Sequence, residues 1–167
     1  KQEYLDSIGK NISSRLSLRK PQVKSLEILS NLISNIKLDK NRNVNDILKE
    51  IIELYPSVES FEREFPSVCF ALATGVGKTR LMGAFISYLF LKGVSRHYFI
   101  LAPNLTIYQK LKEDFNPKNE KYVFKGMQEI ASNEPEIITG EDYDTGRGVR
   151  NENLSKGSQT TIYNNES

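Results

Sequence analysis

The sequence has one cysteine, one histidine and no tryptophan among 167 residues. A single cysteine excludes an internal disulfide framework, and because Cys69 stands in an apolar run we expect it to be a small buried residue. With His97 as the only histidine, no histidine–cysteine metal cluster can form, and no Ser-His-Asp arrangement is evident. The cysteine count indicates a reducing compartment, the cytoplasm.

Long apolar runs and a strong net charge are also lacking. No run is long enough to span a membrane, and residues 1–20 are too polar and basic for a signal peptide, so we expect no membrane partner. The net charge of +2 does not by itself indicate nucleic acid. Residues 1–24 are basic and residues 128–144 are acidic. A basic N-terminal segment favours phosphate backbones, but a solvated surface explains it equally well.

Apolar spacing predicts two helices in the first third of the chain. Residues 22–36 carry apolar side chains on one helical face, after Pro21, a residue tolerated at a helix start. Residues 44–55 repeat this spacing until Pro56 ends it. The polar residues 37–43 form the expected loop between the two helices.

The next segments predict a parallel α/β core. Residues 67–72, Ser-Val-Cys-Phe-Ala-Leu, have the pattern of a buried parallel strand, and residues 97–102 have that of the next one. Helices are expected after each strand, over 78–92 and 105–115. This alternation predicts an α/β domain with a parallel sheet in three layers.

The pattern weakens after residue 115. Residues 122–124 and 137–139 are expected to be short strands, and the polar residues 140–167 a long loop or frayed end. We divide the chain into an N-terminal helical segment (1–66), an α/β core (67–139) and the polar remainder.

A glycine-containing loop follows the first predicted strand, with the sequence Ala73-Thr74-Gly75-Val76-Gly77-Lys78-Thr79. Gly75 and Gly77 permit positive φ angles, which let backbone N–H groups turn inward. Together with the N-terminus of the next helix, those groups form a cradle for phosphate oxygens. Lys78 would reach the β and γ phosphates, and Thr79 would offer a hydroxyl to Mg²⁺. The alternative is a plain glycine turn, since Leu72 stands where the full Walker pattern has glycine.

Three segments resemble motifs of superfamily 2 helicases. Leu72–Thr79 is similar to motif I, closest to the Ala-Thr-Gly-x-Gly-Lys-Thr form of the Res subunits of type III restriction enzymes and the motor subunits of type I enzymes, where an apolar residue at Leu72 is usual. Leu18-Arg19-Lys20-Pro21-Gln22 resembles the segment whose glutamine reads adenine. Leu101-Ala102-Pro103-Asn104 resembles motif Ia, which lies on the DNA backbone. The resemblance covers about residues 18–115, in the family's order.

The resemblance implies the first RecA-like domain of an ATP-driven motor that uses ATP and Mg²⁺ and acts on double-stranded DNA. It implies nucleotide contacts at Gln22, Thr74, Gly75, Val76, Gly77, Lys78, Thr79 and Arg80. It assigns catalytic roles to Lys78 and Thr79, with Thr79 also the Mg²⁺ ligand. It implies DNA contacts at Asn104, Leu105 and Thr106. The simpler alternatives are an ordinary helix residue for Gln22 and a helix N-cap for Asn104.

Motif II, the Asp-Glu-x-His/Asp box that would hold Mg²⁺, does not occur in the sequence. Glu141-Asp142-Tyr143-Asp144 lacks the adjacent Asp-Glu order and a preceding apolar strand. Gly146-Arg147-Gly148-Val149-Arg150 matches the spacing of motif VI, but that motif belongs to the second motor domain, so we do not assign it. No nuclease motif is present. We therefore expect the first part of a motor domain, ending before motif II and inactive alone.

Three hypotheses remain open. The leading one is the ATP-binding part of a DNA-translocating superfamily 2 ATPase, the restriction subunit of a type III-like restriction–modification enzyme. Its partners would be DNA and a methyltransferase subunit, and the full-length protein would carry an endonuclease. The second is a phosphate-loop protein of another class, such as a small kinase. The third is a folded module that binds little or nothing.

Overall fold

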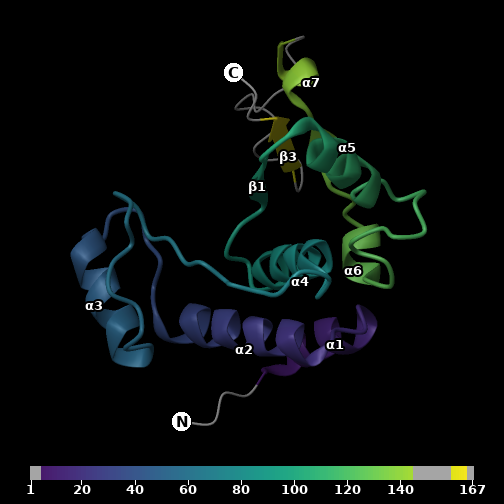
Figure 1. Ribbon diagram of the computed structural model, residues 1–167. Coiled ribbons are helices and arrows are strands. Elements are labelled where there is room, and N and C mark those ends of the chain that lie inside the picture. The colour runs from purple at the N-terminus through teal and green to yellow at the C-terminus, as the bar shows by residue number, and fades with distance from the viewer. Residues whose placement is uncertain (1–4, 145–158, 165–167) are drawn as a thin grey trace.

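The computed structural model describes residues 5–144 and 159–164 of the chain. Figure 1 shows how its helices and strands follow one another. In chain order they are α1 (Ser7–Arg15), α2 (Lys20–Asn35), α3 (Val44–Leu54), α4 (Lys78–Leu91), β1 (His97–Ala102), α5 (Leu105–Asp114), α6 (Gln128–Ala131), β2 (Glu136–Ile138), α7 (Gly140–Asp144) and β3 (Gln159–Asn164).

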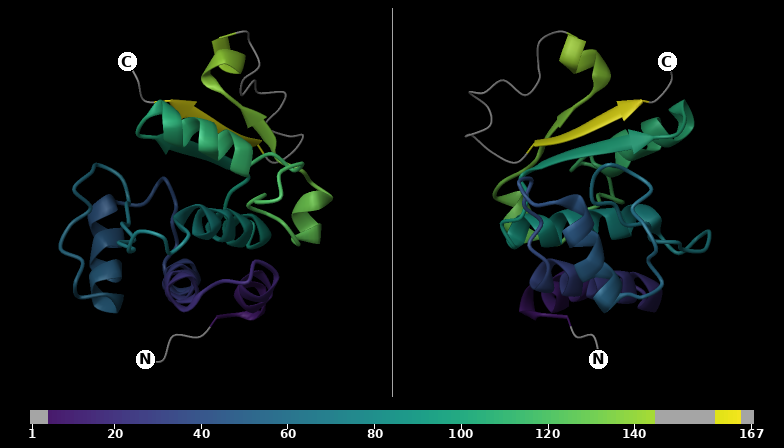
Figure 2. Two further views of the ribbon diagram at one scale, coloured as in Figure 1. Left: turned by 45° about the vertical axis from the view of Figure 1, so that its right-hand side comes forward. Right: turned by 90° about the vertical axis from the view of Figure 1, so that its left-hand side faces the viewer.

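The strands form a parallel sheet in the order β1-β3-β2. β1 pairs with β3 along its whole length, from His97 opposite Gln159 to Ala102 opposite Asn164. Helix α5 packs against β1 and β3 (Figure 2). The predicted strand at 97–102 is confirmed, and the one at 137–139 is confirmed within one residue as β2. The predicted helices at 22–36, 44–55, 78–92 and 105–115 are likewise present, with ends shifted by at most two residues.

The first predicted strand is wrong. Residues 67–72 belong to no strand, and Val68 and Cys69 are exposed, so the expectation of a buried Cys69 is wrong as well. Phe70 packs edge-to-face on Phe85 of α4, with ring centroids 4.8 Å apart. A strand needs partners for its backbone N–H and C=O groups, and no described strand lies beside this segment. Its apolar side chains therefore pack on α4 without a ladder.

Two later predictions also need correction. Residues 122–124 form turns, in which Phe124 is buried against Phe115 with ring centroids 5.6 Å apart. The polar region after residue 139 contains α7 and β3, although it was expected to be a loop. β-Branched and aromatic residues occur among the polar ones in residues 159–164, and such residues favour strands. The motif VI-like segment at 146–150 lies outside the described residues.

Helix α2 joins two hydrophobic clusters. Its first half packs with α1 on α4, in the cluster that also includes residues of β1 and α5. Its last turn, with Leu32, meets Ile47 and Ile51 of α3 and Phe61 in a smaller cluster. One helix thus connects α3 to the part of the core that contains α1 and α4.

Polar contacts reinforce that position. The hydroxyl of the fully buried Tyr88, on α4, donates to the Asp6 carboxylate at 2.9 Å and lies 2.8 Å from the Ser30 hydroxyl on α2. Burial opposes ionisation of Asp6, but hydrogen bonds from the Gly9 N–H, from Tyr88 and from Lys92 outweigh it and lower the pKa of that carboxyl. None of the described helices is long and apolar enough to cross a membrane.

Candidate phosphate-binding site

The loop at residues 73–77 leads directly into α4, which begins at Lys78. Gly75 and Gly77 have φ angles of 81° and 93°, which confirms the positive-φ geometry predicted for both. A Cβ added at Gly75 would meet no atom within 4 Å, so the loop borders open space there. The first N–H groups of α4 have no acceptor inside the helix and are available to an anion.

Two side chains of the N-terminal segment hold this loop. Gln22 lies in the first turn of α2, 1% exposed, and its Nε2 donates to the Gly77 carbonyl at 2.8 Å. Its Oε1 accepts from the Arg19 N–H at 2.7 Å, so both ends of the amide are engaged. The Arg19 guanidinium in turn donates to the Gly75 carbonyl at 3.3 Å. The loop is thus attached to α2 at two alternate carbonyls.

These bonds determine where the loop N–H groups point. A trans peptide unit is planar, so its C=O and N–H point in opposite directions. Because the carbonyls of Gly75 and Gly77 are directed to Arg19 and Gln22, the N–H groups of Val76 and Lys78 point away from α2. Alternate N–H groups turned outward in this way, beside a helix N-terminus, form an anion-binding concavity.

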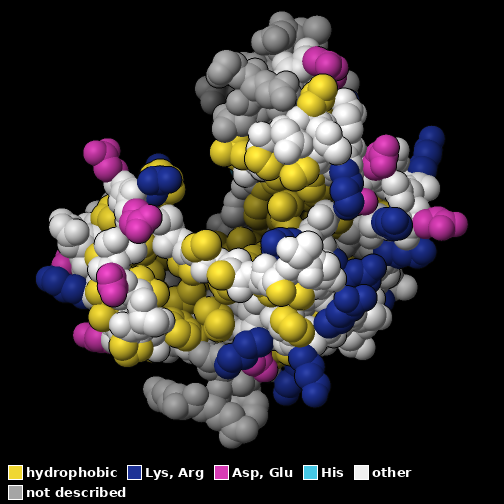
Figure 3. Space-filling view, in the orientation of Figure 1, with side chains coloured by type: hydrophobic (Ala, Val, Ile, Leu, Met, Phe, Trp, Pro, Cys, Tyr) yellow, Lys and Arg dark blue, Asp and Glu magenta, His cyan; other side chains and the backbone are white. Residues whose placement is uncertain are grey.

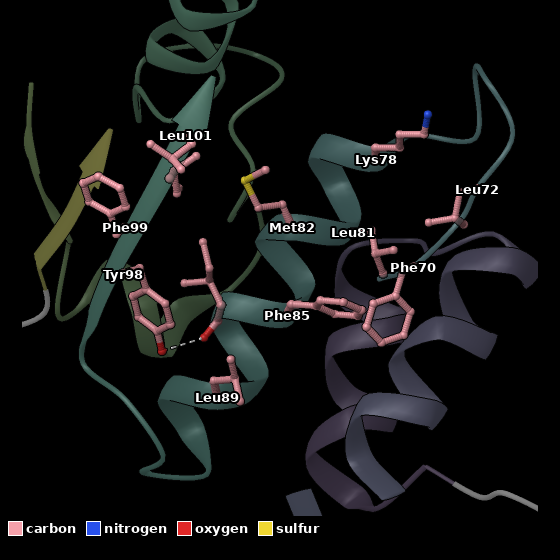
Figure 4. A pocket seen from close by; sticks show the side chains of 12 residues that line it. Phe70, Leu72, Lys78, Leu81, Met82, Phe85, Leu89, Tyr98, Phe99 and Leu101 are labelled. Atoms are coloured by element: carbon pink, nitrogen blue, oxygen red, sulfur yellow. Dashed lines mark hydrogen bonds between the residues drawn. The ribbon is translucent and has the colours of Figure 1, made fainter. Parts of the chain in front are cut away.

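The remaining predicted nucleotide ligands differ in their placement. The exposed Lys78 side chain extends from the amino end of α4 and away from the apolar residues below it (Figure 4). Thr79, in the same turn, is partly buried, and Thr74 is exposed. Arg80 is turned back, because its Nη1 donates to the Leu16 carbonyl at the end of α1 at 2.7 Å.

The predicted DNA-contacting residues lie at the amino end of α5. Asn104, Leu105 and Thr106 are all exposed. The Asn104 side chain accepts from the Ile107 N–H at 3.0 Å, which confirms its prediction as an N-cap. These residues follow the carboxyl end of β1, which lies on the same side of the apolar cavity as the amino end of α4 (Figure 4). Ligands of parallel α/β sheets bind at the carboxyl ends of strands.

An apolar cavity of about 420 Å³ separates α4 from β1 (Figure 4). Phe70 and Leu72 line one wall and Phe99 and Leu101 of β1 the other. The Tyr98 hydroxyl donates to a carbonyl of α4, and burial raises the pKa of this phenol. Apart from Lys78, the lining offers no charged group for chemistry, so this cavity is not a candidate active site.

The donors at the loop fit a nucleotide phosphate chain: outward backbone N–H groups, an ammonium and a hydroxyl. The described residues contain no group of three His, Cys, Asp or Glu side chains able to hold a metal ion. Among the loop residues, the Thr79 hydroxyl is the oxygen donor that would fit Mg²⁺.

The sequence analysis did not identify two features of the site. One is the bond from Arg19 to the loop, and the other is the support that Gln22 gives to Gly77. The contact between Arg19 and Gln22 themselves had a local signal, because the two residues have the spacing of a capping box. The Gln22 side chain does accept from the Arg19 N–H. The contacts across to the loop have no local signal.

The chain was compared with known protein families, curated proteins and solved structures. A family model described as "Type III restriction enzyme, res subunit" matches residues 15–163, which include Gln22, the loop and residues 104–106. No curated protein and no solved structure matches the chain significantly.

Proposed function

The chain belongs to the family of type III restriction enzyme res subunits, and on this basis we propose that it is the ATP-binding part of a DNA-translocating superfamily 2 ATPase. Family membership indicates a helicase-like ATPase module with a phosphate-loop, RecA-like fold. We further propose that this fold has three layers and that the protein acts in the cytoplasm. ATP hydrolysis would drive its movement along DNA.

The observation that carries the proposal is the orientation of the loop. Arg19 and Gln22 hold two carbonyls on one side, so the N–H groups of Val76 and Lys78 are ready to bind phosphate oxygens without rearrangement. Lys78 would bind the β and γ phosphates, and Thr79 would ligate Mg²⁺. When bound, Mg²⁺ would neutralise charge on the phosphoryl group. Thr74 and Arg80 would complete the contacts, Arg80 after leaving the Leu16 carbonyl.

Gln22 would contribute to base recognition through the hydrogen-bonding capacity it still has. A glutamine amide has two N–H donors and two acceptor lone pairs, and one of each is used by Gly77 and Arg19. The remaining donor and acceptor match the acceptor and donor on one edge of adenine. Because Gln22 is buried, base binding requires the residues that cover it to move.

For DNA, we propose backbone contacts by Asn104, Leu105 and Thr106. They are exposed at the start of a ten-residue helix, where N–H groups favour a phosphate. Such contacts position a protein on DNA without reading sequence. We also propose that a methyltransferase subunit is a partner and that the full-length protein carries an endonuclease.

Nucleotide titration of site variants tests the proposal. We expect Lys78→Ala to abolish ATP binding or weaken it severely, because it removes the ammonium from the phosphates. Thr79→Ala should cause a larger defect with Mg²⁺ than without it. Lys49→Ala, an exposed lysine on α3, serves as the control. Unchanged ATP affinity after Lys78→Ala would remove this lysine from the site and contradict the proposal.

A further inference from the structure

A second charged feature lies beside the phosphate loop. A groove of about 570 Å³ runs between the end of α1, the first turn of α4, the second half of α5 and the loop at 115–127. In the space-filling view, Lys and Arg side chains gather on the side of the molecule where α1, α6 and this loop lie (Figure 3). The groove's basic residues are Arg15, Arg80, Lys110, Lys121 and Lys125, and its acidic residues are Asp114 and Glu120.

Most of these cations keep their charge uncompensated. Lys110 is paired with the buried Asp114. By contrast, Arg15 donates to the Gly126 carbonyl at 3.1 Å and Lys125 to a main-chain carbonyl at 3.2 Å. Carbonyl groups fix a cation in place but carry no net charge.

Arg80 is likewise held by an uncharged main-chain group, the Leu16 carbonyl. None of Arg15, Arg80, Lys121 and Lys125 forms an ion pair with a carboxylate in the described part of the chain. Five cations against two carboxylates leave the groove a surplus of three positive charges, more than the +2 of the whole chain. The chain therefore concentrates its positive charge here.

The phenol that lines the groove does not reduce this positive field. Burial, with a contribution from Glu134, raises the pKa of Tyr122 to about 12, so its phenol stays neutral near pH 7. The two arginines also retain donors. Each guanidinium has five N–H groups, of which Arg15 uses two and Arg80 one in the bonds found. Planar guanidinium groups with free donors suit phosphate oxygens.

We propose that this basic groove binds the phosphate backbone of a nucleic-acid strand. The proposal deepens the proposed function, since it takes nucleic acid as the partner and adds a contact surface to residues 104–106. Helix α5 connects the two, with Asn104 at its start and Lys110 in its second half. Ten residues of helix are about 15 Å long, which is about the rise of four nucleotides at ~3.4 Å each. One strand can therefore reach from the groove to the start of α5.

The lining predicts how the binding behaves. Its contacts are cations and main-chain groups, and the lining aromatic, Tyr122, is partly buried rather than displayed for base stacking. Recognition should therefore be independent of sequence and strongly weakened by salt, as phosphate contacts are.

The test compares two pairs of exposed lysines in the 167-residue chain. Lys121→Gln with Lys125→Gln removes two charges from the groove, and Lys37→Gln with Lys49→Gln removes two from the side where α3 lies. Fluorescence anisotropy follows binding of a labelled mixed-sequence oligonucleotide, single-stranded and duplex, over a salt series. For the groove pair we expect affinity to fall about tenfold at low salt, and the slope of log K against log salt to shrink by about 1.5. The control pair should keep nearly the oligonucleotide affinity and the salt slope of the parent chain.

ATP titration of the same variants separates this proposal from the nucleotide site, because the groove reaches Gly77 and Thr79. We expect the groove pair to leave ATP affinity unchanged, and inorganic phosphate to compete weakly with the oligonucleotide. Equal losses of oligonucleotide affinity in both lysine pairs, or no oligonucleotide binding by the parent, would contradict the proposed role of the groove. Neither result would bear on Lys78 or on ATP binding. Loss of ATP affinity with unchanged oligonucleotide binding would assign the groove to the nucleotide.

Discussion

At the scale of single residues, the phosphate loop depends on Gln22. The loop would ordinarily be held by a preceding strand, but residues 67–72 form no ladder here. The buried amide of Gln22 helps to hold the loop instead, through its hydrogen bond to the Gly77 carbonyl. A Cβ at Gly77 would lie 2.7 Å from Gln22 Nε2, so glycine is needed there for this close approach as well as for its φ angle.

Two substitutions of Gln22 should separate shape from hydrogen bonding. Gln22→Ala removes two hydrogen bonds, to the Gly77 carbonyl and from the Arg19 N–H, although the Gly77 carbonyl still accepts from the Leu81 N–H. We expect the free energy of unfolding to fall by about 1–3 kcal/mol. Gln22→Glu keeps the shape but places an acceptor against the Gly77 carbonyl, so the folded state favours the protonated carboxyl. Its folded-state pKa is then raised. The variant should be stable below the unfolded pKa of about 4.3 and lose stability as pH rises through the folded value.

Denaturant unfolding of the parent and both variants across a pH series measures this. The parent provides the control, since it has no ionisable group at this position. If Gln22→Glu unfolds with the same pH dependence as the parent, the amide does not donate to Gly77 in solution.

At the scale of elements, Asn104 combines a structural and a proposed functional role. Its side chain caps α5, so Asn104→Ala should lower the free energy of unfolding by about 0.5–2 kcal/mol. Asn104→Asp retains the cap but adds a negative charge where a DNA phosphate is proposed to bind. We expect it to keep parental stability and to weaken oligonucleotide binding several-fold. Thermal unfolding and anisotropy check the two effects. Parental oligonucleotide affinity in Asn104→Asp would leave Asn104 as a cap only.

The elements also show what could be predicted from the sequence. Helix α5 and its cap were predictable because the signals are local: a side chain, the N–H three residues later and an apolar spacing. Residues 67–72 and 97–102 have similar apolar patterns, yet only the second is a strand, because a strand depends on partners distant in sequence. The central strand β3 was missed because its polar residues resemble a loop, and its partners β1 and β2 are distant in sequence.

For the site, the resemblance predicts nucleotide contacts at Gln22 and the loop, but it does not predict that the two are hydrogen-bonded to each other. Their bond joins residues 55 positions apart, so no local pattern could reveal it. The basic groove was missed for the same reason. Arg15, Arg80 and Lys121 come from separate segments and converge only in the fold.

At the scale of the whole molecule, we expect negligible ATP hydrolysis by the 167-residue chain and DNA binding that is weak and strongly salt-dependent. Phosphoryl transfer needs a phosphate cradle, a carboxylate that holds the metal, a positioned water and arginines at the developing charge. The sequence supplies the cradle, Lys78 and Thr79 but no motif II. Loss of an arginine finger alone typically lowers the rate by about 10³–10⁵.

Turnover of ATP by the purified chain, with and without duplex DNA, measures this expectation. The acidic residues that follow β2 are candidates to replace motif II, but Asp142 has a structural role. Its carboxylate accepts from the N–H and the hydroxyl of Thr139, at 3.1 and 2.9 Å, and so holds the turn before α7. DNA-stimulated turnover of about 1 s⁻¹, an ordinary enzymatic rate, would show that a catalytic carboxylate was overlooked. Glu141→Gln, in an exposed residue of the same helix, and Asp142→Asn would then identify it, because only the catalytic position loses turnover while ATP binding persists.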